Sequence, residues 1–301
     1  MRHVPLALST LAALVLGGAA IQARPAAPVA FNSRRAYHDL ARIVAFGPRP
    51  AGSSALAATR RYIERQLKAA GVRYREQPFL ARTPIGPIHM VNIIATIPGA
   101  SPDRLLITGH YDTKLERRFR FVGADDGGSS AAFLLEIARD LQHRRNRMTI
   151  QVVFFDGEEA MVHWTGTDHT YGSQHFVDAA RRDGTLGRIK AMVLIDMVGD
   201  RNLDISRDDN STTWLTDIIW QTAHRLGLGS YFLDQHTQIE DDHIPFLQAG
   251  VPSVDVIDLD YAPWHTAADT LDKVSARSLQ IVGDVVLGAL PQIETRAMQA
   301  R

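Results

Sequence analysis

Acidic residues follow a strongly apolar run in the middle of the chain. Residues 150–155 lead directly into Asp156, and Glu158 and Glu159 come just after it. Carboxylates this close repel one another unless a cation lies nearby. If one glutamate bound a metal, its neighbour would remain free to transfer a proton, so the pair would have separate roles. A solvated acidic turn explains this segment, taken alone, equally well.

A second pair of acids, Asp125 and Asp126, lies among glycines immediately before a predicted helix at residues 128–142. One aspartate in this place is explained as a helix N-cap. Two adjacent like charges are not explained in that way, and they indicate a nearby cation. The flanking glycines would allow the backbone to approach a bound group closely.

Two histidines are candidate metal ligands or ligand supports. His110 and Asp112 are two positions apart, which places them on the same side of an extended segment, where the carboxylate could orient the imidazole. A strand-end histidine satisfied by its neighbour is the commoner arrangement, and His110 alone is therefore a weak signal. His265 follows Trp264 in a polar segment. Nitrogen and oxygen ligands without sulfur fit a catalytic zinc ion (Zn²⁺), although other divalent metals remain open.

The elements that must position these residues alternate along the chain. Short, β-branched apolar runs predict buried strands at 105–109, 150–155, 191–195 and 253–257. Amphipathic segments predict helices at 33–45, 54–70, 128–142, 170–182, 212–226 and 276–293. This alternation predicts a three-layer α/β sandwich with a mixed, mostly parallel central sheet flanked by helices. The acids and histidines, with Asp196, follow the strands, and ligands bind beyond the carboxyl ends of such strands.

Composition limits the classes of partner. The 301 residues carry 33 basic and 33 acidic side chains, so no global field favours nucleic acid or an anionic membrane. The hydrophobic content of 45% supports a sizeable core, and we expect one catalytic domain over residues 31–301. The chain has no cysteine, which excludes thiol catalysis and cysteine ligation of a metal.

The first residues differ in composition from the rest. A short basic start and an apolar run predict a signal peptide at 1–23, and the following residues 24–30 read as a linker. An uncleaved membrane anchor is the weaker alternative, because proline, serine, threonine and paired glycines interrupt the run. We therefore expect a secreted or periplasmic protein without stable membrane insertion after cleavage.

The ordered set of site residues resembles a known superfamily. The sequence of His110, Asp112, Asp126, Glu158, Glu159, Asp196 and His265 resembles that of the zinc-dependent aminopeptidases. The surrounding segments resemble the glutaminyl cyclase branch of that superfamily, and they include residues 110–114, 121–124, 154–160, 163–164, 171–173, 241–247, 250–252 and 264–266. The resemblance runs from about residue 31 to beyond residue 272, which is nearly all of the expected mature chain.

This resemblance implies a glutaminyl-peptide cyclotransferase, which closes an N-terminal glutamine to pyroglutamate and releases ammonia. It implies one zinc ion held by Asp126, Glu159 and His265, which would polarise the γ-carbonyl of the glutamine. Glu158 would move the proton from the attacking amine to the departing amide nitrogen. The remaining roles are also implied by the resemblance: Asp196 and Asp241 in the hydrogen-bond network around Glu158, and Trp164, Trp264 and Glu240 in substrate binding. Partners would be peptides or proteins with N-terminal glutamine, and we expect a monomer.

Three positions depart from the animal cyclases. Gly127 stands where they carry serine, Glu240 where they carry glutamine, and Asp255 where they carry histidine. The departures bear on the substrate pocket more than on the metal ligands.

The main alternative is a two-zinc aminopeptidase. In that enzyme His110 and Asp196 would hold a second metal bridged by Asp126, with Asp112 supporting the histidine, and Glu158 would activate water. A non-catalytic binding domain that kept the fold is a third hypothesis. It predicts the loss of site residues, whereas the full set is intact here.

Overall fold

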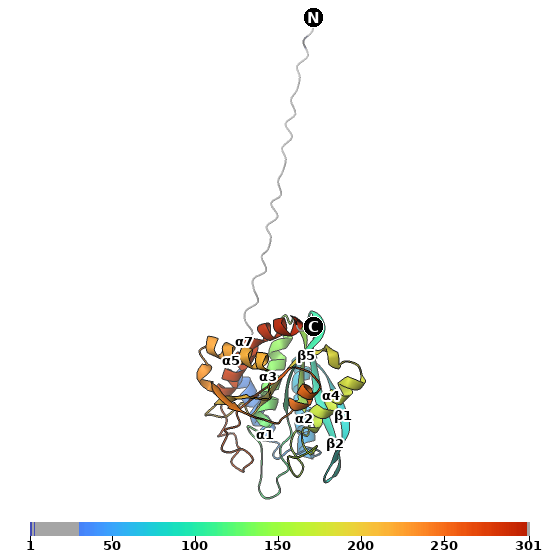
Figure 1. Ribbon diagram of the computed structural model, residues 1–301, viewed down its shortest axis with the longest axis vertical. Helices are drawn as coiled ribbons and strands as arrows, with labels where there is room; N and C mark the ends of the chain where they lie inside the picture. The colour runs from blue at the N-terminus through green and yellow to red at the C-terminus, as the bar shows by residue number, and fades with distance from the viewer. Residues whose placement is uncertain (2, 4–29, 300–301) are drawn as a thin grey trace.

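A mixed sheet of six strands runs through the centre of the protein (Figure 1). The computed structural model describes Met1, His3 and residues 30–299. The strands follow one another across the sheet as β1 (Arg73–Thr83), β2 (Gly86–Ile97), β4 (Met148–Phe155), β3 (Ser101–His110), β5 (Ile189–Asp196) and β8 (Ser253–Ile257). The last four are mutually parallel, whereas β1 and β2 form an antiparallel hairpin, with β2 antiparallel to β4.

Helices cover both faces of this sheet. One face carries α1 (Ser33–Val44), α2 (Ser54–Ala69), α3 (Gly128–Gln142), α5 (Thr213–Arg225) and α7 (Ala276–Gln299), and the other carries α4 (Tyr171–Arg182) and α6 (Ile244–Gln248). In β5 the side chains of Val193 and Ile195 enter the core on the first face, and Met192 and Leu194 enter the core on the second. Because successive strand residues point to opposite faces, a strand covered on both sides is apolar throughout.

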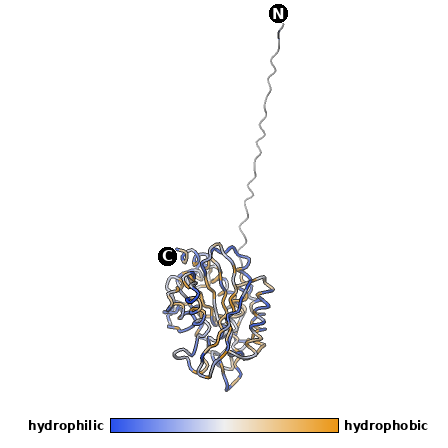
Figure 2. The backbone as a smooth tube through the Cα atoms, turned by 90° about the vertical axis from the view of Figure 1, so that its right-hand side faces the viewer, coloured by the Kyte–Doolittle hydropathy of each residue, from blue (hydrophilic) through white to orange (hydrophobic). Residues whose placement is uncertain are grey.

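Figure 2 shows the same arrangement as hydrophobic segments running through the interior, with more hydrophilic segments outside. The predicted three-layer α/β sandwich is confirmed, and each predicted helix and strand is present, although α7 continues to Gln299, beyond its predicted end at residue 293. The hairpin of β1 and β2, the parallel pair β6 (Ile205–Asp208) and β7 (Phe232–Thr237), and the short helix α6 were not predicted. Strand β1 has mainly exposed side chains, so it lacks the apolar run that marks the buried strands.

Apart from Met1, His3 and residue 30, the predicted signal peptide at 1–23 and the linker at 24–30 lie outside the described residues. Within the part of the chain that the structure describes, no helix has both the length and the apolar character needed to cross a bilayer.

Candidate metal centre and active site

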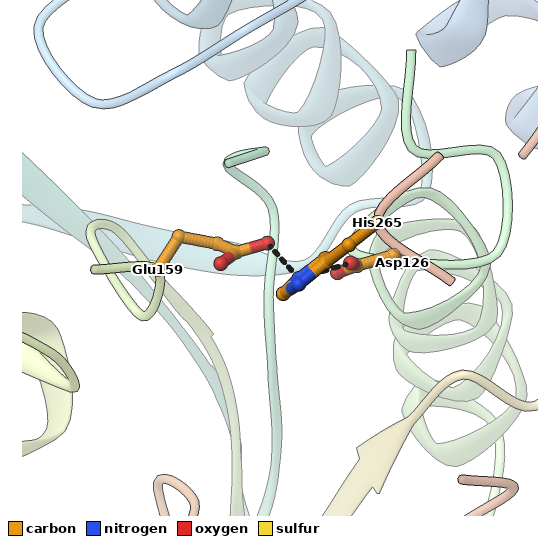
Figure 3. A group of neighbouring side chains, drawn as sticks. All are labelled: Asp126, Glu159 and His265. Atoms are coloured by element: carbon orange, nitrogen blue, oxygen red, sulfur yellow. Dashed lines mark hydrogen bonds and ion pairs between the residues drawn. The ribbon is translucent and has the colours of Figure 1, made fainter. Parts of the chain in front are cut away.

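Three side chains from separate segments converge beyond the carboxyl ends of the parallel strands. Asp126 precedes α3, Glu159 follows β4, and His265 lies in the long segment after β8. One ligand atom from each lies within 4.8 Å of the others. The His265 Nε2 atom is 3.2 Å from Asp126 Oδ2 and 3.2 Å from Glu159 Oε1 (Figure 3). The structure thus brings together the three residues expected to hold the metal.

The environment of this group fits a cation. Asp126 Oδ2 and Glu159 Oε2 are buried, and among the described residues neither has a well-oriented hydrogen-bond donor. The close approach of His265 to Asp126 Oδ2 is an ion-pair distance without that orientation. Burying an unsatisfied anionic oxygen is costly, and a metal cation between the carboxylates would offset the cost. Two carboxylates and one imidazole also form a three-residue donor set of the kind that catalytic zinc sites use.

The pKa of His265 reflects the negative charge of the two neighbouring carboxylates. Burial lowers the pKa of the imidazole, but the nearby carboxylates of Asp126 and Glu159 raise it to about 9. Burial would likewise raise the pKa of Asp126, yet the two neighbouring histidines, His110 and His265, hold it below its ordinary range. The carboxylates that bind a proton on His265 would attract a divalent cation in the same place.

The backbone and two aromatic rings orient His265. Its φ is +52°, in the left-handed region that non-glycine residues rarely adopt. The ring stacks on Trp264 with centroids 4.3 Å apart and meets the edge of Phe121 at 5.9 Å. A strained residue held by its surroundings is typical of functional sites, because packing elsewhere offsets the strain.

The loop that carries Asp126 requires glycine at the next position. Gly127 has φ +73°, and a Cβ on it would lie 2.2 Å from the carbonyl oxygen of Asp112 and 2.9 Å from the His110 ring. The serine found here in animal cyclases therefore cannot be accommodated in this backbone conformation. Asp269 fixes the same loop by accepting hydrogen bonds from the backbone N–H groups of Asp125 at 2.8 Å and Asp126 at 3.2 Å.

Four carboxylates surround His110. Its Nε2 atom is 3.2 Å from Asp196 Oδ1 and 3.3 Å from Asp126 Oδ1, and its Nδ1 atom is 3.4 Å from Asp112 Oδ1 and 3.7 Å from Glu158 Oε2. Burial lowers the pKa of the imidazole, but these acids raise it well above its ordinary value. His110 is thus placed to offset the negative charge of Asp126 and Asp196.

Asp112 contacts more than His110. Its Oδ1 accepts a hydrogen bond from the backbone N–H of Glu158 at 3.2 Å, and its Oδ2 accepts one from Glu159 at 3.4 Å. The same carboxylate thus fixes the backbone that presents both glutamates. The spacing of His110 and Asp112 predicted only the contact between those two residues.

Glu158 faces the cavity from a buried position. Burial raises the pKa of its carboxyl well above the ordinary value; His110 opposes this, and the nearby charges of Asp241 and Glu159 add to it. A carboxyl perturbed in this way beside a metal group is a candidate for proton transfer.

A cavity of about 320 Å³ opens over these groups. Trp164, Trp264, Glu240 and Asp241 line it together with the metal group, and apolar side chains complete its walls: Met197, Ile239, Ile257 and Leu259. Trp264 is 43% exposed, so it flanks the opening. Asp196 lies at the inner end, where it accepts hydrogen bonds from Ser130 Oγ at 3.0 Å and the Met197 N–H at 2.8 Å.

Two basic residues at the site were not predicted. Arg49 is fully buried and donates hydrogen bonds to the carbonyls of Tyr111 at 3.1 Å, Val122 at 2.5 Å and Gly123 at 2.7 Å, which fixes both ends of the loop that leads to Asp126. Lys114 lines the cavity, with Nζ 3.7 Å from Glu159 Oε2. Arg49 lies between two prolines in the segment that joins α1 to α2, and a single arginine in such a segment gives no sequence signal of a tertiary role.

Comparisons with known proteins agree with this geometry. The model of peptidase family M28 matches residues 92–290. A glutaminyl-peptide cyclotransferase-like protein of Mus musculus is 34% identical over 256 residues, a match that covers 74% of this chain and 66% of that protein. The chain thus spans about two thirds of the length of that curated relative.

Solved structures extend the comparison to nearly the whole fold. A glutaminyl cyclase from an Acidobacteriales bacterium has a TM-score of 0.86 at 41% identity, covering 91% of this chain and 99% of that one. A Zn-dependent exopeptidase from Parabacteroides distasonis has a TM-score of 0.80 at 28% identity, covering 88% and 99% respectively. The chain therefore belongs to peptidase family M28 and, within that family, to the glutaminyl cyclases.

Proposed function

We propose that this protein is a zinc-dependent glutaminyl-peptide cyclotransferase that converts the N-terminal glutamine of peptides or proteins to pyroglutamate. The observation that carries the proposal is the presence of two separate groups of side chains around Asp126, one at each of its carboxylate oxygens. Asp126, Glu159 and His265 form the group of potential metal ligands found among the described residues. His110 Nε2 lies 3.3 Å from Asp126 Oδ1 and 3.2 Å from Asp196 Oδ1, and we assign this histidine the role of counter-ion to the two acids in place of ligand to a second ion. Family membership supports the same activity.

The fit of the three ligands to zinc defines what a bound ion would supply, which is Lewis-acid polarisation of the γ-carbonyl of the glutamine. Glu158 accepts a proton from the α-amine as the amine nitrogen bonds to the side-chain carbonyl carbon. It returns the proton to the amide nitrogen as the bond to that carbon breaks and ammonia leaves. The raised pKa of Glu158 supports its use as both acid and base. No water molecule is consumed.

The other site residues position Glu158 and the substrate. Burial, together with the charges of Asp196 and Asp242, raises the pKa of Asp241 well above its ordinary value, so it can donate a hydrogen bond in the cavity. Asp196 anchors His110, which in turn approaches Glu158. Trp164 and Trp264 offer apolar walls for the glutaminyl side chain, and Glu240 lies at the edge of the cavity.

One assay separates this function from the peptidase. The purified mature chain, loaded with zinc, is incubated with a Gln-Ala peptide and separately with an amino-acid anilide. We expect pyroglutamyl-Ala and ammonia from the first and no anilide hydrolysis. Hydrolysis of the anilide without cyclisation would overturn the proposal in favour of the aminopeptidase, and inactivity toward both substrates with zinc bound would reject both enzymes.

We further propose that residues 1–23 direct export, so that the catalytic domain at 31–301 acts as a monomer outside the cell or in the periplasm. The basic and apolar composition of the first residues supports this. N-terminal sequencing of the exported protein tests it, with a first residue at Arg24 as the expected result. Retention of Met1 in the membrane fraction would indicate an uncleaved anchor.

A further inference from the structure

A second cavity adjoins the active-site cavity. It has a volume of about 270 Å³ and is polar, with walls formed by α4, α6 and the segment before α4. Glu240 and Asp241 line both cavities. Asp241 is buried, whereas the side chain of Glu240 is 60% exposed at the junction. The two spaces are therefore neighbours that share one acidic edge.

A stacked pair of rings separates the two cavities. Trp164 lines the active-site cavity and His169 lines the second one. Their rings are nearly parallel, at 11°, with centroids 4.4 Å apart. The two cavities meet at Glu240 and Asp241, which line both, so a chain that leaves the first cavity along this shared edge passes directly to the second. A peptide whose first residue fills the active-site cavity would thus place its next side chain over the second cavity.

Glu240 determines the charge of the second cavity. Within residues 30–299 its ion-pair partner is His169, whose Nε2 atom is 3.9 Å from Glu240 Oε1. Burial lowers the pKa of His169, which leaves this imidazole neutral at neutral pH and Glu240 uncompensated. The other exposed acid in the cavity wall, Asp178, pairs with Arg181 at 3.1 Å, so these two charges offset each other. The net charge facing a bound peptide is therefore negative.

We infer that the second cavity binds the residue that follows the N-terminal glutamine, and that Glu240 selects lysine or arginine there. The inference rests on the proposed function, because it assigns the first cavity to the glutamine. The carboxylate is partly exposed, so an ion pair with a basic side chain would contribute as surface pairs do. This corresponds to about a two- to fivefold preference in kcat/KM.

The test measures kcat/KM for three peptides that differ only at the second position: Gln-Lys-Ala, Gln-Ala-Ala and Gln-Glu-Ala, each amidated. The wild-type zinc enzyme is expected to prefer lysine over glutamate, and the preference should shrink in high salt. In Glu240→Gln the ratio of the lysine to the glutamate peptide should fall toward one. In Glu240→Lys it should invert. Asp183→Asn removes a charge from the exposed end of α4 outside both cavities, and it should keep the wild-type ratio.

Failure of this inference can be distinguished from failure of the proposed function. If the glutaminyl peptides are cyclised but the ratio is the same in the wild type, Glu240→Gln and Glu240→Lys, the second cavity does not select the second residue. If Asp183→Asn changes the ratio as much as Glu240→Gln does, the preference reflects the overall charge, and the inference is likewise overturned. If none of the peptides is cyclised by the wild-type zinc enzyme, the proposed function itself fails.

Discussion

His265 and His110 contact the same aspartate from opposite sides, yet their surroundings differ. His265 Nε2 is 3.2 Å from Asp126 Oδ2, and His110 Nε2 is 3.3 Å from Asp126 Oδ1. The His265 side chain is 22% exposed and lines the cavity, whereas that of His110 is 2% exposed at the end of β3. Four carboxylates surround His110, and two approach His265.

The difference in surroundings suits the two histidine–aspartate contacts to different roles. A histidine open to a cavity, with orphaned carboxylate oxygens beside it, is placed to share a metal ion with them. A histidine enclosed by acids is placed to carry a proton and act as their counter-ion. We therefore propose that the His265 side of Asp126 binds zinc and that the His110 side replaces the second ion of the hydrolases with an imidazolium.

Glu158→Gln should give the largest effect. Glu158 lies on the His110 side, with Oε2 3.7 Å from His110 Nδ1, and is not one of the proposed ligands. Removal of its proton transfer should lower kcat by about 10²- to 10⁴-fold. Zinc content, measured by elemental mass spectrometry on the same sample, should stay at the wild-type level. Loss of zinc from this variant would mean that Glu158 is a ligand, and the proposed division between the two sides would be wrong.

Substitution of each histidine tests the comparison directly. His265→Ala removes one of three ligands and should weaken zinc binding by about 100-fold or more, which exceeds the 10- to 100-fold effect of losing an outer partner of a ligand. His110→Gln removes such an outer partner and should retain zinc more tightly than His265→Ala does. Competition with a zinc chelator measures both affinities.

Folding must be checked beside these affinities, because His110 offsets the charge of four buried acids. Circular dichroism reports whether His110→Gln is folded before its zinc is measured. A folded His110→Gln that binds zinc as weakly as His265→Ala would place His110 among the ligands. The two-metal arrangement would then be favoured.

The sequence indicated that the proposed ligands lie at one edge of the sheet because Glu159 and His265 follow strands whose apolar runs are readable, and Asp126 precedes a readable helix. Burial on both faces makes β4 and β5 continuous in hydrophobicity, so the acids after them stand out. The chain order of ligands then carried the resemblance to a family. The resemblance implied which three would bind the metal. Strand β1 escaped prediction because pairing with β2 along its whole length, and not an apolar run, determines its structure.

Residues whose roles depend on distant parts of the chain could not be predicted in this way. Arg49 precedes α2, yet its partners are the carbonyls of Tyr111, Val122 and Gly123. Its role follows from where the fold places these three carbonyl groups. Glu240 was assigned to substrate binding from the resemblance, but its position between two cavities follows from the stacking of Trp164 on His169.

Removal of zinc should have the smallest effect, seen in the stability of the protein. A ligand present at 100 times its Kd stabilises the native state by about 2.7 kcal/mol, and for a domain of this size that corresponds to a shift of about 5–10 °C in Tm. Chelation should therefore lower the Tm of the wild type most, and that of His110→Gln by a smaller amount that follows its weaker zinc binding. It should leave His265→Ala unchanged, because that variant has little zinc to lose. Calorimetry with and without chelator measures the shifts, and a shift in His110→Gln as small as that in His265→Ala would place His110 among the zinc ligands.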